Sequence, residues 1–401
     1  MGRMTKIAKV QTFDVIIVGA GPAGLSFART LVGSGLNVAV VERQSRAQLA
    51  DPAIDGRDIA LTQRSEATMR ELGIWQHMPG EEIAFIRHAK VINGKTNYAL
   101  HFDHRETGAD YLGPIVGNDV IRRAVFAAFD EADAGTLIDG CAVVAAGSDE
   151  RMAHVTLDDG RRLQASLLVA ADSRFSETRC HMGLAARMRD FGRNCIVCRM
   201  DHVHGHDDTA FECFHYERTL AVLPLPGRQS SVVITLPADQ AAEVMAMGEG
   251  ALNRDIAARF GHRLGAMTLI GERHNYPLVA VYADRFHGRR FALIGDAAVG
   301  MHPVTAHGFN LGLRSATTLA EEIKASVKAG RGIGASAGLR RYHMAHNRAA
   351  RPIYLGTNML VGLYTDDRRP ARLARKVLLH AGNIIRPARH RIMRQLTDKA
   401  A

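Results

Sequence analysis

The sequence predicts an α/β protein in which a parallel nucleotide-binding sheet is combined with an inserted, mainly antiparallel β domain and C-terminal helices. Three observations support this prediction. A strand–glycine loop–helix–strand pattern occupies residues 14–41, and a second strand followed by a long helix occupies 291–330. Short β-rich runs separated by Pro and Gly fill 181–280. The 401 residues suffice for about two domains.

The first pattern is a βαβ unit. Residues 14–18 are almost all apolar, as expected of a strand buried on both faces. Apolar residues then recur with helical spacing over 22–32, where Gly33 ends the helix, and 38–41 form a second apolar strand. A crossover unit of this length should be parallel and right-handed.

The loop inside this unit carries the strongest functional signal. Gly19 makes the tight turn, Gly21 lets the backbone approach a pyrophosphate, and Gly24 lets helix and strand pack closely. The helix N-terminus that follows offers N–H groups to phosphates. Glu42, at the end of the second strand, is placed to accept hydrogen bonds from a ribose. The sequence therefore predicts a Rossmann-like dinucleotide site, although NAD and FAD both use such a loop.

The second pattern begins with a strand at 291–294, followed at once by Gly295 and Asp296. A long helix follows, in which apolar residues step by 4, 3, 4, 3 and 4 from Phe309 to Val327. This spacing places one apolar stripe on the helix, and Gly330 is a natural stop.

Together these motifs resemble the FAD-dependent monooxygenases of the p-hydroxybenzoate hydroxylase fold (GR2 type) over nearly the whole chain. Within these motifs the local sequence is most similar to the ubiquinone-biosynthesis hydroxylases, the UbiH, UbiF and especially UbiM-like proteins. The segments that carry the resemblance are the glycine loop, 55–62, 170–179, Gly295-Asp296, 301–303 and 308–313.

The resemblance implies bound FAD, transient NADPH or NADH, O2, and hydroxylation of a polyprenylated phenol or quinol precursor at C5 or a related position. It requires no metal and no side-chain nucleophile. Two alternatives stay open: a prenyl reductase of the geranylgeranyl reductase type, and a non-catalytic flavin- or lipid-binding partner. A flavin halogenase is excluded because its motif needs two tryptophans and the chain has only Trp75.

The resemblance also implies site residues. The cofactor-binding residues would be Gly19, Gly21, Gly24, Glu42, Arg43, Arg57, Arg122, Asp172, Gly295, Asp296, Pro303, Gly308, Phe309 and Asn310. The catalytic residues would be Arg57, Pro303, His307 and Gly308.

Two departures from the family pattern bear on these roles. Ser173 follows Asp172 where the family has Gly, and His307 precedes Gly308 where the family often has Gln. For His307 two interpretations stay open, a histidine hydrogen-bonded to the backbone and a group that acts in proton transfer or regiochemistry.

The resemblance divides the chain into alternating segments of two domains and a tail. The expected boundaries are 10–75, 110–180 and 281–345 for the FAD-binding domain, 76–109 and 181–280 for the substrate domain, and 346–401 for basic C-terminal helices.

Cysteine and histidine patterns favour structural roles. Five cysteines are too few and odd in number for a disulfide framework, and Cys195-x-x-Cys198 has the β-branched context of a strand. The histidine-rich run 201–206 is interpreted as an exposed turn. No metal site is expected.

Positive charge is concentrated at the C-terminus. The net charge is +10, and residues 365–401 hold ten Lys or Arg against three Asp, a net +7. Basic helices with apolar residues interspersed are typical of binding to anionic membranes, and a solvated helical face packed on the FAD-binding domain is the alternative. No apolar run reaches the ~18–20 residues of a membrane span. We therefore expect a cytoplasmic protein with peripheral contact to the inner face of a membrane or to a biosynthetic complex, without nucleic-acid binding.

Overall fold

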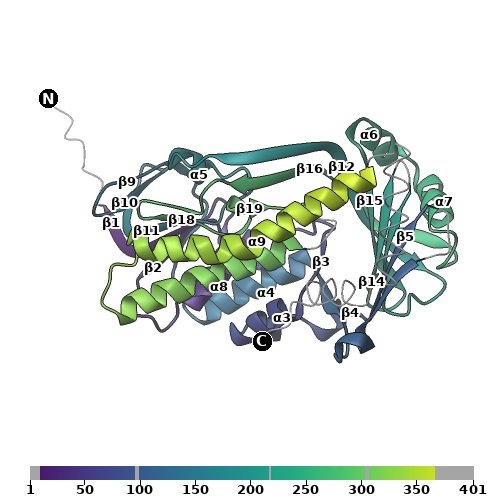
Figure 1. The fold of residues 1–401 in the computed structure, drawn as a ribbon, viewed down its shortest axis with the longest axis horizontal. Helices are drawn as coiled ribbons and strands as arrows, with labels where there is room; N and C mark the ends of the chain where they lie inside the picture. Colours follow the sequence, from purple (N-terminus) through teal and green to yellow (C-terminus); the bar gives the residue numbers. More distant parts are fainter. Residues whose placement is uncertain (1–9, 95–98, 216–217, 303–306, 366–401) are drawn as a thin grey trace.

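The computed structural model describes residues 10–94, 99–215, 218–302 and 307–365. The described chain forms two lobes joined by long strands (Figure 1). One lobe holds the predicted parallel sheet, in the strand order β17-β18-β11-β1-β2-β8. Its strands are β1 (Gln11–Val18), β2 (Val38–Val41), β8 (Thr136–Ile138), β11 (Arg162–Ala170), β17 (His287–Gly288) and β18 (Phe291–Leu293), with β9 (Val143–Ser148) and β10 (Ala153–Leu157) attached beside β11.

The predicted βαβ unit is confirmed, because β1 and β2 pair in parallel with α1 (Pro22–Thr30) between them. The second pattern is confirmed as well, because β18 pairs in parallel with β11 and is followed by a long helix. Three long helices pack with α1 or with one another beside this sheet: α4 (Asn118–Glu131), α8 (His307–Lys328) and α9 (Ser336–Thr365). The apolar stripe of α8 is buried or packed on the core, which explains its spacing.

Short helices connect these elements. They are α2 (Arg46–Ala50), α3 (Gln63–Glu71), α5 (Glu177–His181), and the 3₁₀ helices η1 (Trp75–His77), η2 (Gly80–Glu82), η3 (His104–Thr107) and η4 (Gly295–Ala297).

The second lobe, here called the substrate lobe, is built on an eight-stranded sheet in the order β19-β16-β12-β15-β14-β13-β5-β6. Every pair in it is antiparallel except β13 with β5. Its strands are β5 (His88–Asn93), β6 (Ala99–Asp103), β12 (Ala186–His202), β13 (Thr209–Phe214), β14 (Thr219–Leu225), β15 (Gln229–Pro237), β16 (Met267–Ala283) and β19 (Val299–Gly300).

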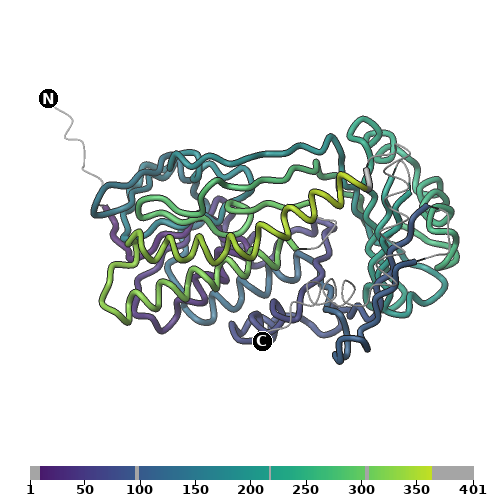
Figure 2. The backbone as a smooth tube through the Cα atoms, in the orientation of Figure 1, coloured from purple at the N-terminus to yellow at the C-terminus, as the bar shows by residue number. Residues whose placement is uncertain are grey.

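One face of this sheet is covered by α6 (Ala238–Ala246) and α7 (Glu249–Arg259), which form an apolar core with it. Those helices were not foreseen in the sequence. The other face of the sheet is here called the inner face. It is directed at the lobe with the parallel sheet and at a small sheet of β3 (Asp58–Ala60), β4 (Ile83–Ile86) and β7 (Gly113–Gly117). Figure 2 follows the chain as it passes between the two lobes.

Two smaller predictions have different outcomes. Cys195 and Cys198 are strand residues as expected, both are buried, and burial raises the pKa of each thiol to about 12. The interpretation of 201–206 as an exposed turn is wrong for His202, which ends β12 and is 6% exposed. Its Nε2 lies 3.0 Å from the hydroxyl of Ser230 on the neighbouring strand, so sheet pairing holds it inside.

Candidate functional site

The glycine loop between β1 and α1 is shaped by two packing constraints. Gly19 has φ +105°, and a Cβ there would lie 2.6 Å from the carbonyl oxygen of Ala171. A Cβ on Gly24 would lie 2.0 Å from the carbonyl oxygen of Gly19. Gly21 differs, because no atom lies within 4 Å of its would-be Cβ. The loop is therefore closed on the sheet side and open at Gly21, where the N-terminus of α1 faces outward.

Glu42 lies beside this loop. Its carboxylate accepts hydrogen bonds from the backbone N–H of Ala20 at 2.7 Å and of Gln44 at 2.9 Å. The side chain of Gln44 in turn accepts a bond from the guanidinium of Arg122 at 2.8 Å. Each carboxylate oxygen accepts one of these bonds and keeps further acceptor capacity, as an acceptor for ribose hydroxyls requires.

Asp172 approaches the same loop from β11. Its Cα would lie 2.9 Å from a Cβ on Gly19, and its Oδ2 accepts a bond from the N–H of Thr178 at 3.3 Å. Its Oδ1 is buried and has no hydrogen-bond partner among the described residues. Arg43 is farther out, in an exposed ion pair with Glu177 at 3.3 Å.

The turn at Gly295 packs directly on the helix of the glycine loop. Gly295 has φ +60°, and a Cβ there would meet the Cβ of Ala23 at 2.9 Å. Its N–H donates to the hydroxyl of Ser315 on α8 at 2.9 Å. A Cβ on Gly312 would lie only 3.4 Å from the Cα of Gly295. These close approaches place Asp296 next to the start of α1.

Two arginines that follow Asp172 in the chain hold this turn. Arg174 donates to Asp296 Oδ2 at 3.0 Å, and Arg179 donates to the carbonyl oxygen of Ala297 at 2.9 Å. Arg179 is 3% exposed, so the second contact is inside the protein. Both arginines lie in the segment 170–179 that carries the resemblance, but the sequence gave no indication of Arg174.

Arg57 is the one basic residue of the 55–62 motif. Its guanidinium pairs with Asp55 at 2.6 Å and lies over the ring of Tyr276 at 5.6 Å. Asn118 donates to the same carboxylate at 2.7 Å. Burial opposes the charge of Arg57, but Asp55 outweighs it and raises the pKa of Arg57, with a smaller contribution from Asp296.

Asn310 connects the 55–62 motif to α8. Its Oδ1 accepts a bond from the N–H of Thr62 at 2.9 Å, and its Nδ2 donates to the carbonyl oxygen of Ala60 at 3.0 Å. Phe309 is partly buried against the core, and a Cβ on Gly308 would meet no atom within 4 Å. The first turn of α8 is therefore anchored on one side and open at Gly308.

The remaining predicted positions surround the start of α8. Pro303 lies outside the described residues. His307 is the first residue of α8 and is partly buried. His302 is 4% exposed, stands edge-on to Phe191 with ring centroids 5.1 Å apart, and is neutral at ordinary pH because burial lowers its pKa to about 4.

The inner face of the substrate sheet meets these motifs. The hydroxyl of Tyr276 on β16 donates to the carbonyl oxygen of Asp55 at 2.7 Å. Arg199 on β12 pairs with Asp58 at 2.7 Å, where the Asp58 side chain is fully buried. The inner face therefore lies against the segment that bears Arg57.

Glu212 is a residue that the sequence reasoning missed. It lies in a row with Ala221, Val233 and Val197, which are matched in register across β13, β14, β15 and β12. Val197 packs in the same cluster as Tyr276, so this row belongs to the inner face. Burial raises the pKa of Glu212 to about 8, which keeps the carboxyl neutral at pH 7. The signal in the sequence was one acidic residue inside the apolar strand 210–214.

These features fit FAD. The open position at Gly21 leaves room for a pyrophosphate, and the buried, unpartnered Oδ1 of Asp172 is an acceptor that lacks its donor. Glu42 contacts the glycine loop at Ala20, and Asp296 follows Gly295, which packs on Ala23; these are positions suited to a ribose and a ribityl chain. The role of each residue toward the cofactor stays a prediction.

Comparisons with known proteins agree with this geometry. A family model described as an FAD binding domain matches residues 12–354. The chain is 45% identical over 388 residues to ubiquinone hydroxylase UbiM of Neisseria meningitidis, covering 96% of this chain and 84% of the relative. It is 32% identical over 381 residues to ubiquinone hydroxylase UbiL of Rhodospirillum rubrum, covering 95% and 88%.

Among solved structures, PqsL of Pseudomonas aeruginosa, described as a probable FAD-dependent monooxygenase, superposes with a TM-score of 0.78. The sequence identity is 20%, and the match covers 91% of this chain and 99% of the other. At this identity the likeness supports the fold.

Proposed function

Because the chain belongs to the FAD-binding domain family, within its ubiquinone hydroxylase branch, we propose that it hydroxylates a polyprenylated phenol or quinol precursor of ubiquinone. It is a single-component, FAD-dependent monooxygenase that uses NADPH or NADH and O2, with C5 or a related ring carbon as the target. The observation that carries the proposal is the convergence of five motifs that are distant in the sequence: the glycine loop, 55–62, 170–179, Gly295-Asp296 and 308–313. The 55–62 motif also contacts the inner face of the substrate sheet.

FAD, when bound, supplies the oxygen chemistry, and the chain supplies position, charge and a dry pocket. The positive end of α8 would stabilise negative charge on a flavin ring bound beside its N-terminus. Arg57, fixed by Asp55, would add a second positive charge. The apolar residues of the inner face would exclude water from the reacting ring.

Glu212 supports the aromatic-alcohol part of the proposal. It is the acidic member of an otherwise apolar row, and a neutral carboxyl can both donate to and accept from a ring hydroxyl. We infer that it orients the hydroxyl group of the precursor, in the role of a positioning residue for the ring.

The test is complementation with quinone analysis. The gene is expressed in strains that each lack one ubiquinone hydroxylase, and lipid extracts are examined by mass spectrometry. Restored ubiquinone in one strain supports the proposal and identifies the carbon that is hydroxylated. If no strain is rescued although the purified protein is yellow and is reduced by NAD(P)H, the quinone assignment is wrong.

Oxygen uptake separates the proposal from a prenyl reductase. A hydroxylase consumes one O2 for each NAD(P)H when the precursor is present, whereas a reductase consumes none. A flavin that stays oxidised with NAD(P)H and precursor would instead indicate a non-catalytic binding partner.

We also propose peripheral membrane contact through the C-terminal region. No described helix is long and apolar enough to cross a bilayer. The second half of α9 nevertheless exposes Leu355, Met359 and Leu360, at 51%, 76% and 37%, and it leads into the basic segment 366–401, which lies outside the described residues. Exposed apolar side chains beside concentrated positive charge favour an anionic membrane surface.

Truncation tests this contact. Removing 368–401 should abolish co-sedimentation with anionic vesicles at low salt, and high salt should weaken binding of the full chain, because the attraction is electrostatic. Binding that is unchanged by the truncation would contradict the proposal.

A further inference from the structure

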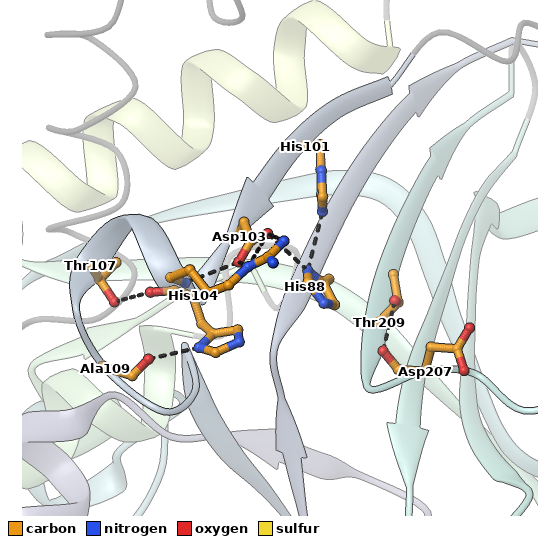
Figure 3. A network of polar contacts seen from close by, with 9 residues as sticks. His88, His101, Asp103, His104, Thr107, Ala109, Asp207 and Thr209 are labelled. Carbon is orange, nitrogen blue, oxygen red and sulfur yellow. Dashed lines mark hydrogen bonds and ion pairs between the residues drawn. The ribbon is translucent and has the colours of Figure 1, made fainter.

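The outer edge of the substrate sheet carries a cluster of metal-ligating side chains that the proposed reaction does not use. In the β5–β6 hairpin, His88 is directly opposite Asp103, and Lys90 is opposite His101. Because side chains alternate along a strand, His88, His101 and Asp103 project from one face of the hairpin. Figure 3 shows the three side chains directed toward one another.

The distances are close to those of a metal site. Nε2 of His101 lies 3.3 Å from Nδ1 of His88, which lies 3.8 Å from Oδ2 of Asp103. All three atoms are within 4.8 Å of one another. Tetrahedral zinc, with bonds of about 2.0–2.1 Å, holds its ligand atoms about 3.3 Å apart. We propose that His88, His101 and Asp103 bind one divalent cation of the zinc type.

The chemistry of the ligand set favours zinc over calcium or magnesium. Two imidazole nitrogens and one carboxylate oxygen suit a borderline cation, whereas magnesium and calcium select oxygen ligands. Three protein ligands leave a fourth position for water.

Arg105 competes with the cation for Asp103, and its backbone also helps to orient the Asp103 carboxylate. Its guanidinium pairs with Oδ2 of Asp103, the oxygen assigned to the metal. The Arg105 side chain is 76% exposed, so its guanidinium can move into solvent when a cation takes its place beside Asp103. The backbone N–H of Arg105 donates to Oδ1 of Asp103 at 2.9 Å and does not depend on the guanidinium. This bond orients the carboxylate, as outer-shell contacts do in metal sites.

The cluster lies away from the flavin motifs. Thr209 of β13 is matched in register with His88. Phe211, two residues further along β13, projects from the same face as Thr209 and packs against Phe260 at the end of α7. The cluster is therefore on the helix-covered face, opposite the inner face. A cation there would clamp the edge strand β6 to β5, and its effect would be on stability.

A hydrogen-bonded histidine pair is the competing explanation, since 3.3 Å also fits one imidazole donating to the other. Zinc titration of the FAD-loaded full-length protein separates the two. The protein is first dialysed free of metal and carries Cys180→Ser, because Cys180 is an exposed thiol that could bind zinc. Bound metal is measured by equilibrium dialysis with elemental analysis.

One tight equivalent of Zn²⁺ is expected in this background and in His104→Ala. His104 is the matched control because its ring stands next to His88, with centroids 5.8 Å apart, but it contributes none of the three ligand atoms. Its Nδ1 lies 2.7 Å from the carbonyl oxygen of Ala109 instead. In His101→Gln the dissociation constant should rise at least about 10- to 100-fold, because a direct ligand matters no less than an outer-shell contact.

Asp103→Asn gives a second measurement if His101→Gln fails to fold, and the flavin spectrum without zinc reports folding for both. Zinc should raise the melting temperature of the background protein and of His104→Ala but of neither cluster variant. Equal zinc binding in all variants, or no tight equivalent in the background protein, would overturn the proposal.

Discussion

Gly21 and Gly24, in the same loop, should respond differently to substitution. Gly24 is enclosed, since a Cβ there would overlap the carbonyl oxygen of Gly19, whereas a Cβ on Gly21 would enter open space. Gly21 has φ −70°, a conformation that any residue adopts. The absence of a side chain at Gly21 therefore serves a ligand, and the absence at Gly24 serves the fold.

Gly21→Val should lose FAD while the protein stays folded. The expected loss of unfolding free energy in the apoprotein is about 1 kcal/mol or less, because no protein atom is displaced and Val only replaces Gly at the N-cap of α1. Bound flavin is measured by absorbance, and stability by urea unfolding of apoprotein. Gly147→Val is the control, since it also meets no atom within 4 Å but lies on β9. Full flavin content in Gly21→Val would contradict the pyrophosphate assignment.

Glu212 gives a prediction about pH. Its pKa is raised from 4.5 to about 8, so the native state keeps a proton that the unfolded state releases. This group therefore contributes a loss of stability that grows as pH rises from about 4.5 to 8. Glu212→Gln should raise the melting temperature more at pH 9 than at pH 4. It should also remove the step near pH 8 in KM for the precursor, and equal effects at both pH values would contradict this interpretation.

At this scale, local motifs were informative and isolated residues were not. The glycine loop, Glu42 and Gly295-Asp296 could be predicted because each belongs to a fixed strand–loop–helix geometry. Glu212, Arg174 and the cluster of His88, His101 and Asp103 could not, because their surroundings come from segments that are distant in the sequence and that only folding brings together.

At the scale of elements, the first turn of α8 is fastened to β3 by one side chain. Asn310 satisfies the N–H of Thr62 and the carbonyl oxygen of Ala60, on either side of Leu61. Thr62 is 5% exposed, so water cannot readily replace this contact. Since β3 also follows Arg57 directly, this clamp fixes the distance between Arg57 and α8.

Asn310→Ala should destabilise the protein by about 1–3 kcal/mol, since it leaves a buried donor and acceptor unsatisfied. FAD-dependent NAD(P)H oxidation should fall further than FAD occupancy does, because Arg57 loses its support. Lys324→Ala, on the exposed side of the same helix, should change neither. Chemical denaturation and flavin titration measure the two effects, and a stability equal to that of Lys324→Ala would contradict the clamp.

The composition of α6 and α7, the two helices that the sequence analysis missed, does favour helices. Ala238–Ala246 and Glu249–Arg259 are rich in Ala, the residue that most favours helices. The β-rich runs on either side obscured them. His202 had no such signal, because its burial depends on Ser230, which joins it only when β15 pairs with β12.

At the scale of the whole molecule, the lobes are joined by a charge pair. Burial raises the pKa of Asp58 although the guanidinium of Arg199 lies 2.7 Å away. For the Asp58 carboxylate, the cost of desolvation therefore outweighs the attraction of Arg199, and the pair depends on both partners being present.

Arg199→Met should lower the unfolding free energy by about 3–5 kcal/mol, because it leaves the buried Asp58 carboxylate without a partner. The double variant Asp58→Asn with Arg199→Met should lose much less stability. Urea unfolding of the single and double variants measures the coupling. Equal losses in both would show that packing of the arginine, and not its charge, joins the lobes.

The architecture as a whole was predictable as two domains, but the way they connect was not. The 17-residue strands β12 and β16 each span both lobes, and local sequence gives no reason for a strand to continue past a domain boundary. Their register breaks between Asp190 and Asn194 and again between Val197 and Arg199, where pairing partners shift.

This two-strand ribbon determines the mechanics of the molecule. A flexible linker would let the lobes swing freely, but a hydrogen-bonded ribbon resists bending and yields only where its ladder is interrupted. The interruptions therefore act as a torsion joint of small amplitude, with Gly192 at φ +60° inside the first one. The two lobes should therefore keep a nearly constant spacing, and the proposed polyprenylated substrate would have to enter and leave without a wide swing of one lobe against the other.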